Sequence, residues 1–353
     1  MTAPAYTYYR FPHADHYTLL EGETEELLSC NLLNGKSGFV IAPFEARPDQ
    51  PIVVIRPDRL TTVPCPTGTP ANFTTSQHVT PPTAEYRIDF ANFHAQLLQG
   101  TFRKIVLARC AEETPQKAVQ FQDLFLRACQ LYPRMFIALV HTPQSGTWMT
   151  ATPEILLEGH GNDWRTIALA GTMKLEGELL SSEGESMTWS TKNIEEQRIV
   201  ATYIAECLEQ FTTEFHEEGP RTVRAANLVH LRSDFSFTLS SNDRLGDLLQ
   251  TLHPTPAVCG LPKRDAFKFI VQNEHTPRRY YSGFMGPLNM PLTTHHSSLP
   301  STHLYVSLRC MNIEGERYHL YAGGGLLKES TEEQEWQETE AKLETMRRLL
   351  YSK

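Results

Sequence analysis

The chain has 353 residues, 40% of them hydrophobic, and a formal net charge of -9 at pH 7. This length suits one large domain or two, and the composition is that of an ordinary globular protein. The negative charge, without any run of Lys and Arg, argues against nucleic acid or an anionic membrane as the main partner. An anionic ligand would therefore need a local pocket of positive charge.

The N-terminus and the cysteines indicate the compartment. The opening MTAPAYTYYR lacks the basic start and apolar centre of a signal peptide, and no apolar stretch approaches the length of a membrane span. We therefore expect a cytoplasmic protein. The seven cysteines are widely scattered and include no C-x-x-C pair, so they predict neither a disulfide framework nor a zinc site.

The first part of the chain predicts short strands, then a helix, then a strand with a lysine on its apolar face. Residues 1–84 predict short strands, such as SGFVIAP and PIVVIRP, and end near the Pro- and Thr-rich stretch TSQHVTPPTAE. A helix is predicted from Tyr86, with Gly100 as its C-terminal cap. The following TFRKIVLARC alternates as a strand and places Lys104 among apolar neighbours. Such a lysine most often extends to the surface, so this position alone does not indicate function.

The middle of the chain alternates strands with long helices. Strands are predicted at MFIALVH, WMTATPEILLEG and WRTIALAGT, and the apolar stripe of the helix STKNIEEQRIVATYIAECLEQF turns Glu196 towards the protein. After the turn-rich LHPTPAVCGLPKRDAFKFI, the strands YYSGFMGPL and HLYVSLRCMNI flank the polar loop NMPLTTHHSSLPST. Alternation places Arg309 on the polar face of the second strand. This pattern favours an α+β or layered α/β fold.

The stretch LYAGGGLLKESTEEQEWQETEAKLETM sets three glycines before a glutamate-rich helix. No nucleotide-binding glycine pattern is present, but glycines permit a ligand to approach backbone N–H groups in a nest that suits a carboxylate. Ser330 and Glu333 predict a capping box at the start of the helix.

On that helix Glu335, Glu338 and Lys342 share one face. This arrangement is more often a solvated face with an ion pair. Carboxylates are also the ligands that magnesium prefers, and Glu196 on the earlier helix is a further candidate.

Eight segments in fixed order resemble the chorismate-utilising enzymes, which include isochorismate synthase, salicylate synthase and the large subunits of anthranilate and aminodeoxychorismate synthases. The segments cover roughly residues 85–350 and are KIVLAR, TPEILLEG, LAGT, KNIEEQRIV, LHPTPAVCG, YYSGFMG, VSLRC and YAGGGLLKESTEEQEWQETEAKL. Each segment is weak alone, but their shared order is specific.

The resemblance implies a single large α+β domain, in which two antiparallel sheets pack face to face with helices outside and the active site in a cleft between the halves. Residues 1–84 would form an N-terminal portion of this fold, and residues 85–353 the chorismate-binding catalytic region. A two-domain split near residue 85 is the alternative.

The resemblance also assigns residues to substrate and metal. The family glutamates that match Glu196, Glu335 and Glu338 surround a magnesium ion, which holds the ring carboxylate of chorismate. The residues that match substrate-binding positions are Thr172, His253, Arg309, Gly323, Gly325 and Lys342.

The reaction type depends on two further positions. Family members that use water carry a lysine where Lys104 stands, and aminodeoxychorismate synthases carry a lysine at the position of Ala170. The chain therefore resembles a water-using enzyme. Lys104 would act as general base on a water that attacks C2 of chorismate, and Glu154 would act as general acid on the departing C4 hydroxyl. The product would be isochorismate.

Two alternatives remain open. Salicylate synthases share Lys104 and Glu154 and go on to eliminate pyruvate from isochorismate. A non-catalytic carboxylate- or metal-binding protein on the same fold would be expected to lose one of these two residues. The chain also departs from the family in one place, where Glu196-Gln197 stands for a Glu-His pair. The sequence does not reveal the pathway, whether menaquinone, siderophore or salicylate formation, and we expect a monomer because no long apolar surface stripe is present.

Overall fold

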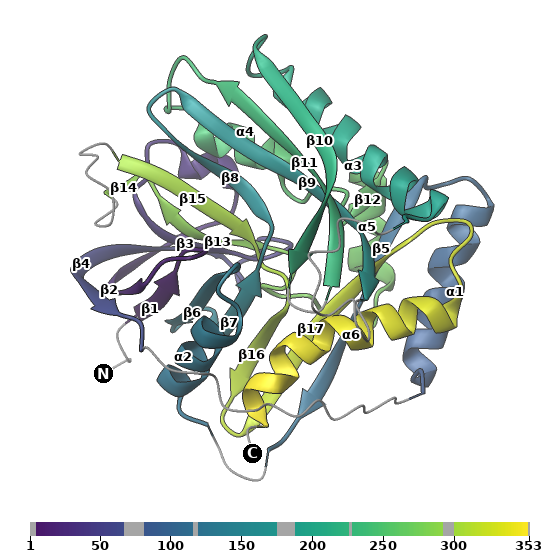
Figure 1. Ribbon diagram of the computed structural model, residues 1–353, viewed down its shortest axis with the longest axis horizontal. Helices are drawn as coiled ribbons and strands as arrows, with labels where there is room; N and C mark the ends of the chain where they lie inside the picture. The colour runs from purple at the N-terminus through teal and green to yellow at the C-terminus, as the bar shows by residue number, and fades with distance from the viewer. Residues whose placement is uncertain are drawn as a thin grey trace.

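The computed structural model describes residues 5–66, 81–115, 119–174, 188–225, 228–291 and 300–351. Within these ranges the chain forms seventeen strands, six α-helices and one 3-10 helix (Figure 1). The strands are β1 (Ala5–Arg10), β2 (His16–Leu27), β3 (Gly38–Ala42), β4 (Ile52–Pro64), β5 (Lys104–Glu113), β6 (Phe136–Thr142), β7 (Gly146–Thr152), β8 (Ile155–His160), β9 (Asp163–Lys174), β10 (Phe215–Ala225), β11 (Leu228–Thr238), β12 (Gly260–Leu261), β13 (Phe284–Leu288), β14 (Met290–Pro291), β15 (Pro300–Val306), β16 (Cys310–Glu314) and β17 (Arg317–Leu326). The helices are η1 (Cys30–Leu33), α1 (Ala84–Leu98), α2 (Phe121–Leu131), α3 (Thr191–Leu208), α4 (Leu245–Leu252), α5 (Lys263–Asn273) and α6 (Glu332–Leu350).

Every strand pair in the described residues is antiparallel, and backbone pairing connects all the strands into one network. The strands before residue 84 belong to this network, because β1 pairs with β6 and β3 pairs with β13. Strand β17 pairs with β5 along nine residue pairs. This ladder sets Gly323 and Gly325 opposite Ala108 and Val106, close to Lys104.

The interior of the fold is lined by strands, and the helices lie outside it. One core cluster contains side chains from strands and connecting segments and none from the described helices, among them Tyr9, Phe39, Ala138, Trp148, Leu169 and Tyr305. Three further clusters pack helices against the outer strand faces. This arrangement confirms the predicted α+β fold, with antiparallel sheet layers packed together and helices outside.

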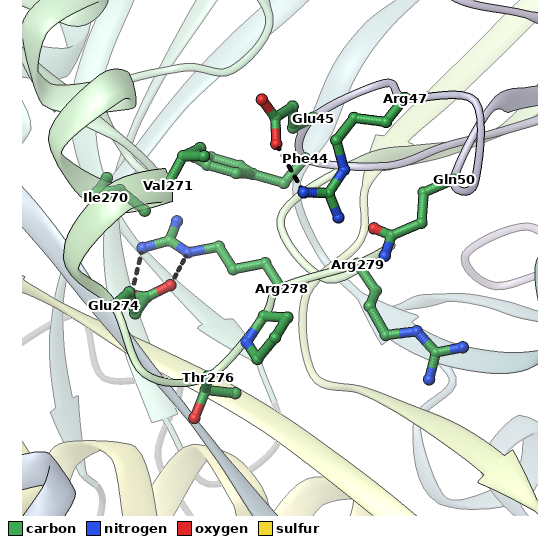
Figure 2. A pocket seen from close by; sticks show the side chains of 11 residues that line it. Phe44, Glu45, Arg47, Gln50, Ile270, Val271, Glu274, Thr276, Arg278 and Arg279 are labelled. Atoms are coloured by element: carbon green, nitrogen blue, oxygen red, sulfur yellow. Dashed lines mark hydrogen bonds and ion pairs between the residues drawn. The ribbon is translucent and has the colours of Figure 1, made fainter.

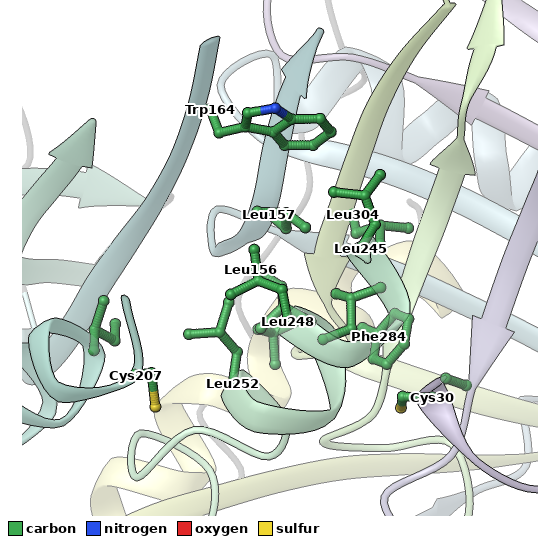
Figure 3. Packing of buried hydrophobic residues seen from close by; sticks show 14 of the residues in the cluster. Cys30, Leu156, Leu157, Trp164, Cys207, Leu245, Leu248, Leu252, Phe284 and Leu304 are labelled. Carbon is green, nitrogen blue, oxygen red and sulfur yellow. The ribbon is translucent and has the colours of Figure 1, made fainter. Parts of the chain in front are cut away.

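Helices α3 and α4 cover one of these outer faces. Leu245, Leu248 and Leu252 of α4 are fully buried, and Figure 3 shows them close to Leu156 and Leu157 of β8. Their spacing along α4 puts all three leucines on one stripe of the helix. Each buried leucine contributes about 1.5–3 kcal/mol relative to an exposed one, so this stripe fixes α4 to the sheet.

Helix α6 lies across β17 and β5 (Figure 1). The Arg109 guanidinium on β5 stacks 3.6 Å from the ring centroid of Trp336, donates to Thr339 at 2.7 Å and pairs with Glu340. Tyr86 of α1 packs edge-on against the same Trp336 ring. These contacts fix the position of α6 on β5. They therefore also fix where its glutamates lie relative to the β17–β5 ladder.

The predicted capping box at the start of α6 is wrong. Thr331 is the N-cap residue, and it makes no side-chain capping bond. The Ser330 hydroxyl instead donates to Glu335 Oε1 at 2.7 Å and accepts from the Leu327 N–H at 3.0 Å. The hydroxyl oxygen thus accepts from the Leu327 N–H and not from a backbone N–H of α6.

The predicted strand HLYVSLRCMNI is two strands with a break between them. Strand β15 ends at Val306 and β16 begins at Cys310. At the break Arg309 adopts a left-handed backbone with φ of 45°. Simple alternation therefore does not set the direction of the Arg309 side chain.

The linker residues up to Thr80 and residues 292–299 of the predicted polar loop lie outside the described residues. All seven cysteines are free thiols, as predicted. In the part of the chain that the structure describes, no helix has the length and apolar character needed to cross a membrane.

Candidate active site

A cavity of about 60 Å³ lies where β5, β9, β11, β17, α3 and α6 meet. Seven of the predicted site residues line the cavity: Glu154, Thr172, Glu196, Arg309, Gly323, Gly325 and Lys342. Segments far apart in the sequence thus converge on one space.

The glycine run Gly323–Gly325 is an extended part of β17 and not the predicted nest. Its lack of side chains is explained by what stands over it. A Cβ atom at Gly325 would lie 2.1 Å from Glu196 Oε1 and 2.9 Å from Lys104 Cε, and one at Gly324 would lie 2.7 Å from Glu335 Oε2. The glycines leave room for charged side chains from three other elements.

Lys104 begins β5 and is fully buried, among the apolar neighbours that the sequence predicted. Its ammonium nitrogen lies 2.9 Å from Glu196 Oε1, but it has no well-aligned hydrogen bond to any described residue. Burial opposes ionisation of Glu196, yet the ammonium groups of Lys104, Lys192 and Lys342 outweigh it and lower the pKa of that carboxyl. A buried ammonium with unused donors is placed to bind a ligand or a water molecule.

Each predicted metal carboxylate is paired with a lysine. Glu196 pairs with Lys104, Glu335 with Lys192, and Glu338 with Lys342 at 2.7 Å. The lysine partner of Glu335, Lys192 in the first turn of α3, was not predicted from the sequence, since one lysine at a helix start carries no distinctive signal.

Glu335 has one carboxylate oxygen with no hydrogen-bond partner among the described residues. Its Oε1 accepts from Ser330 and Lys192, whereas Oε2 is buried without a partner among the described residues. Burial and the neighbouring Glu338 raise the pKa of Glu335 to about 7. Across the described ranges, no three His, Cys, Asp or Glu side chains approach one another closely enough to hold a metal ion by themselves.

Glu154 lies between β7 and β8 and is 3% exposed. Burial raises the pKa of Glu154 to about 8, although the positive charges of Lys104, Arg309 and Lys342 oppose this. At neutral pH the carboxyl group is therefore mostly protonated and can donate a proton.

Arg309 enters the cavity beside His230 of β11. The His230 Nδ1 lies 3.2 Å from the Gly171 carbonyl, which can only accept, so Nδ1 carries the hydrogen and Nε2 accepts from Arg309. Burial and the nearby Arg309 lower the pKa of His230 well below its usual range, so the ring is neutral. The Arg309 Nη1 is buried without a partner in the described part of the chain.

His230 was missed from the sequence. It also lies 3.3 Å from the hydroxyl of Thr172, so it links two of the predicted substrate residues. The available signal was a histidine within the buried strand segment LVHL.

His253 does not line the cavity. Its Nε2 lies 3.3 Å from the Pro43 carbonyl, and its ring packs edge-on against Phe284. Burial lowers its pKa to about 3, so the ring is neutral. The loop that follows it brings Ala257 and Val258 to the cavity wall, so this placement indicates an indirect role.

Gln197 stands where the family carries a histidine, and its amide uses both of its hydrogen-bonding ends. The Oε1 atom accepts from the Ala170 N–H at 2.9 Å, and Nε2 donates to the Ala168 carbonyl at 3.1 Å. The side chain thereby fixes α3 to the cavity segment of β9. The departure from the family pattern leaves the neighbouring Glu196 in the cavity.

A second cavity, of about 160 Å³, lies between the segment after β3 and the end of α5. Figure 2 shows two ion pairs in its lining, Arg278 with Glu274 and Arg47 with Glu45. A third cation of the lining, Arg279, pairs with Glu314. No buried side-chain atom of its lining lacks a hydrogen-bond partner. The first cavity, which contains the unpartnered Arg309 atom, is the better candidate for a ligand site.

Comparisons with known proteins identify the family. A family model described as "Chorismate binding enzyme" matches residues 57–351. The isochorismate synthase EntC of Escherichia coli K12 is 29% identical over 246 residues, which are 69% of this chain and 61% of EntC. The isochorismate synthase MenF of the same strain is 30% identical over 256 residues, 72% of this chain and 57% of MenF. The chain thus matches about three fifths of the length of these relatives.

Solved structures show the same fold over almost the whole chain. The menaquinone-specific isochorismate synthase MenF of Escherichia coli superposes with a TM-score of 0.78 at 24% identity, covering 99% of this chain and 89% of MenF. The Bacillus anthracis protein DhbC, described as a 2,3-dihydroxybenzoate-specific isochorismate synthase, gives a TM-score of 0.82 at 22% identity and covers 98% of this chain and 96% of DhbC. Because the family model matches most of its residues, the chain belongs to the chorismate-binding enzyme family.

Proposed function

We propose that the protein is an isochorismate synthase, which converts chorismate reversibly to isochorismate. The observation that supports this most is a buried, protonated Glu154 in the cavity wall, with the buried Lys104 two residues before the lining residue Val106. The acid and the ammonium group interact electrostatically, since Lys104 is among the charges that act on the Glu154 carboxyl. A hydroxyl exchange needs one group of each kind, a base for the incoming water and an acid for the leaving hydroxyl.

Positive groups in the cavity would hold the two carboxylates of chorismate. Arg309 has a free Nη1, and Lys342 reaches the cavity while it donates to the Gly323 carbonyl at 2.8 Å. Gly323 and Gly325 of β17 contribute backbone to the cavity wall, beside Glu196 and Tyr281. Thr172 would contact the substrate from β9.

The proposed reaction balances without any further reagent. Lys104, as the free amine, takes a proton from water, and the water oxygen forms a bond to C2 of the ring. Electrons shift through the ring, the C4–oxygen bond breaks, and Glu154 gives its proton to the departing hydroxyl. One water enters and one leaves, so substrate and product have the same mass.

The carboxylates suit a magnesium ion. Glu335 Oε2 is a buried oxygen without a partner in the described chain, and Glu196 and Glu338 have oxygen donors that lysines now neutralise. Magnesium usually takes one or two protein carboxylates and completes its shell with water and substrate oxygens. When bound, it would neutralise a substrate carboxylate, and one or two of Glu196, Glu335 and Glu338 would hold it.

Incubation of the purified protein with chorismate and magnesium, with and without a chelator, tests the proposal. We expect a magnesium-dependent product of unchanged mass that separates from chorismate by chromatography. Salicylate together with pyruvate would instead identify a salicylate synthase. Absence of any turnover, with or without ammonia, would contradict the assignment and favour a binding protein on this fold. The monomeric state and the cytoplasmic location stay predictions.

A further inference from the structure

A buried ion pair stands directly behind the active-site strand β5. Glu274 follows the last residue of α5, and Arg278 lies four positions later. Both side chains are almost fully buried, at 3% and 2% exposed. The Arg278 Nε and Nη2 atoms donate to the two carboxylate oxygens of Glu274 at 2.6 and 2.7 Å, as Figure 2 shows. Phe44 packs 4.4 Å beneath the guanidinium.

The same pair also binds the backbone on the active-site side. Arg278 Nη2 donates to the Val106 carbonyl at 2.8 Å, and Nη1 donates to the Val258 carbonyl at 2.6 Å. The Glu274 Oε1 atom accepts from the Ala108 N–H at 2.7 Å. Two side chains thus satisfy three backbone groups from two separate segments.

These bonds take the place of a missing strand. One edge of β5 is paired along its length with β17, but on the other edge the short β12 meets only Lys104 and Ile105. One further backbone bond joins the Val106 N–H to the Cys259 carbonyl. Residues two apart in a strand direct their polar groups to the same edge, so Val106 and Ala108 would otherwise have unpaired groups there. Glu274 supplies the acceptor and Arg278 the donor that a longer β12 would have provided.

The segments held in this way form the active site. Val106 and Val258 line the cavity, and Lys104 lies two residues before Val106 on the same face of β5. The wall of the cavity and the backbone that carries the lysine therefore share one anchor. An arginine suits this task because its planar fork bonds several acceptors in fixed geometry.

We propose that Glu274 and Arg278 are positioning residues, which fix the β5 backbone at Lys104 and the Val258 loop in the geometry needed for catalysis. This proposal rests on the proposed function for its kinetic consequence but not for its structural one. Neither residue lines the cavity that contains Glu154 and Arg309, so both act on it through the backbone.

Two conservative variants test the proposal. Arg278→Lys keeps the charge but cannot bond two carbonyls and a carboxylate together, and Glu274→Gln keeps the shape but loses the charge. We expect each variant to lower kcat for chorismate about tenfold or more, because small misplacement of a catalytic group is costly. The KM should stay within about twofold, because the groups expected to bind substrate lie on other elements. Assays run well below the Tm of each variant.

Arg10→Lys provides the matched control. Arg10 is a buried arginine that also donates to three backbone carbonyls, those of Tyr132, Pro133 and Met135, but none of these residues lines the cavity. Its variant should lose stability while it keeps kcat. Near-normal kcat in Arg278→Lys, or an equal loss of kcat in Arg10→Lys, would overturn the positioning role.

Amide hydrogen exchange supplies a readout that does not need turnover. In Arg278→Lys and Glu274→Gln the amides of Val106 and Ala108 should exchange at least about tenfold faster than in the wild type, because their edge of β5 has lost its anchor. In Arg10→Lys they should exchange at the wild-type rate. If the wild-type protein does not convert chorismate, the proposed function fails and this exchange pattern alone decides the positioning role. Unchanged protection of both amides in the Arg278 variant would refute it.

Discussion

Glu154 is a carboxyl group that the fold keeps protonated at neutral pH. Desolvation favours its neutral form, and the positive charges of Lys104, Arg309 and Lys342 reduce the effect without cancelling it, so that its pKa is about 8. The neighbouring Glu196, whose side chain is 12% exposed, lies beside the Lys104 ammonium, which together with other lysines lowers its pKa. Two glutamates at one cavity therefore differ in protonation, which suits one as an acid and the other as an anion.

Removing either proposed proton-transfer group should slow the reaction. We expect Lys104→Ala and Glu154→Gln to lower kcat by about 100-fold or more, the usual scale for acid–base groups. Steady-state kinetics with chorismate measures the change, and Lys36→Met, which removes a lysine paired with Glu25 away from the cavity, is the control. A variant with near-normal turnover would exclude that residue from the mechanism.

The raised pKa of Glu154 also predicts a pH-dependent cost in stability. Between its ordinary value of 4.5 and about 8, the folded chain binds a proton at Glu154 that the unfolded chain lacks. The free energy of unfolding therefore falls as pH rises through this window. We expect Glu154→Gln to have a higher Tm than the wild type near pH 8, with the difference shrinking towards pH 5. Thermal unfolding at several pH values measures this, and a difference that does not change with pH would argue against it.

At the scale of elements, the ladder of β17 and β5 decides what the site can contain. The glycines of β17 have an extended backbone. Because they have no Cβ atom, they leave room for the side chains of Glu196, Lys104 and Glu335. The helix α6 is held over this ladder by Arg109, which stacks on Trp336. Strand β17 and helix α6 together fix the positions at which these charged side chains meet.

A single methyl group on β17 should therefore disrupt the site. Because Gly325 has no left-handed backbone, Gly325→Ala is acceptable to the strand itself, but its Cβ would overlap Glu196 Oε1 at 2.1 Å. We expect loss of most activity, at least about 100-fold in kcat/KM, with a modest fall in Tm, because the Lys104–Glu196 pair must move. Enzyme kinetics and thermal unfolding measure the two effects. Full activity in this variant would show that the pair tolerates displacement.

At the scale of the whole molecule, the cavity exists only in the folded chain. It joins β5, β9, β11, α3, β17 and α6, which are spread from Lys104 to Leu350. Ligands that bind only the folded state stabilise it by mass action, by about 2.7 kcal/mol at a hundred times their Kd. In the proposed function, the carboxylates near the cavity would couple binding of the anionic substrate to binding of a cation.

Magnesium and chorismate should therefore stabilise the protein cooperatively. We expect the rise in Tm with both ligands to exceed the sum of the rises with each alone, since each completes the site of the other. Thermal unfolding with the four combinations measures this, and Glu335→Gln, which removes the charge of a proposed metal carboxylate, should reduce the cooperative part. A rise that is merely additive in the wild type would contradict the shared site.

Much of this protein follows from its sequence alone. Periodicity gave the helix that carries Glu196, the apolar strand face that buries Lys104, and the shared face of Glu335, Glu338 and Lys342, because such patterns depend only on local geometry. The ordered segments indicated the family, which the comparisons confirm. These features need no knowledge of which segments meet.

Only the tertiary structure decided how those segments act on each other. Several features depend on contacts between distant segments. They are the extended glycines, the contact of Arg309 with His230 at the strand break, the hydrogen bond from Ser330 to Glu335, and the Glu274–Arg278 anchor. The protonation of Glu154 likewise depends on burial, which no local pattern encodes. Side-chain type and spacing determine what each element can offer, whereas desolvation and charge pairing at the meeting point determine what it does.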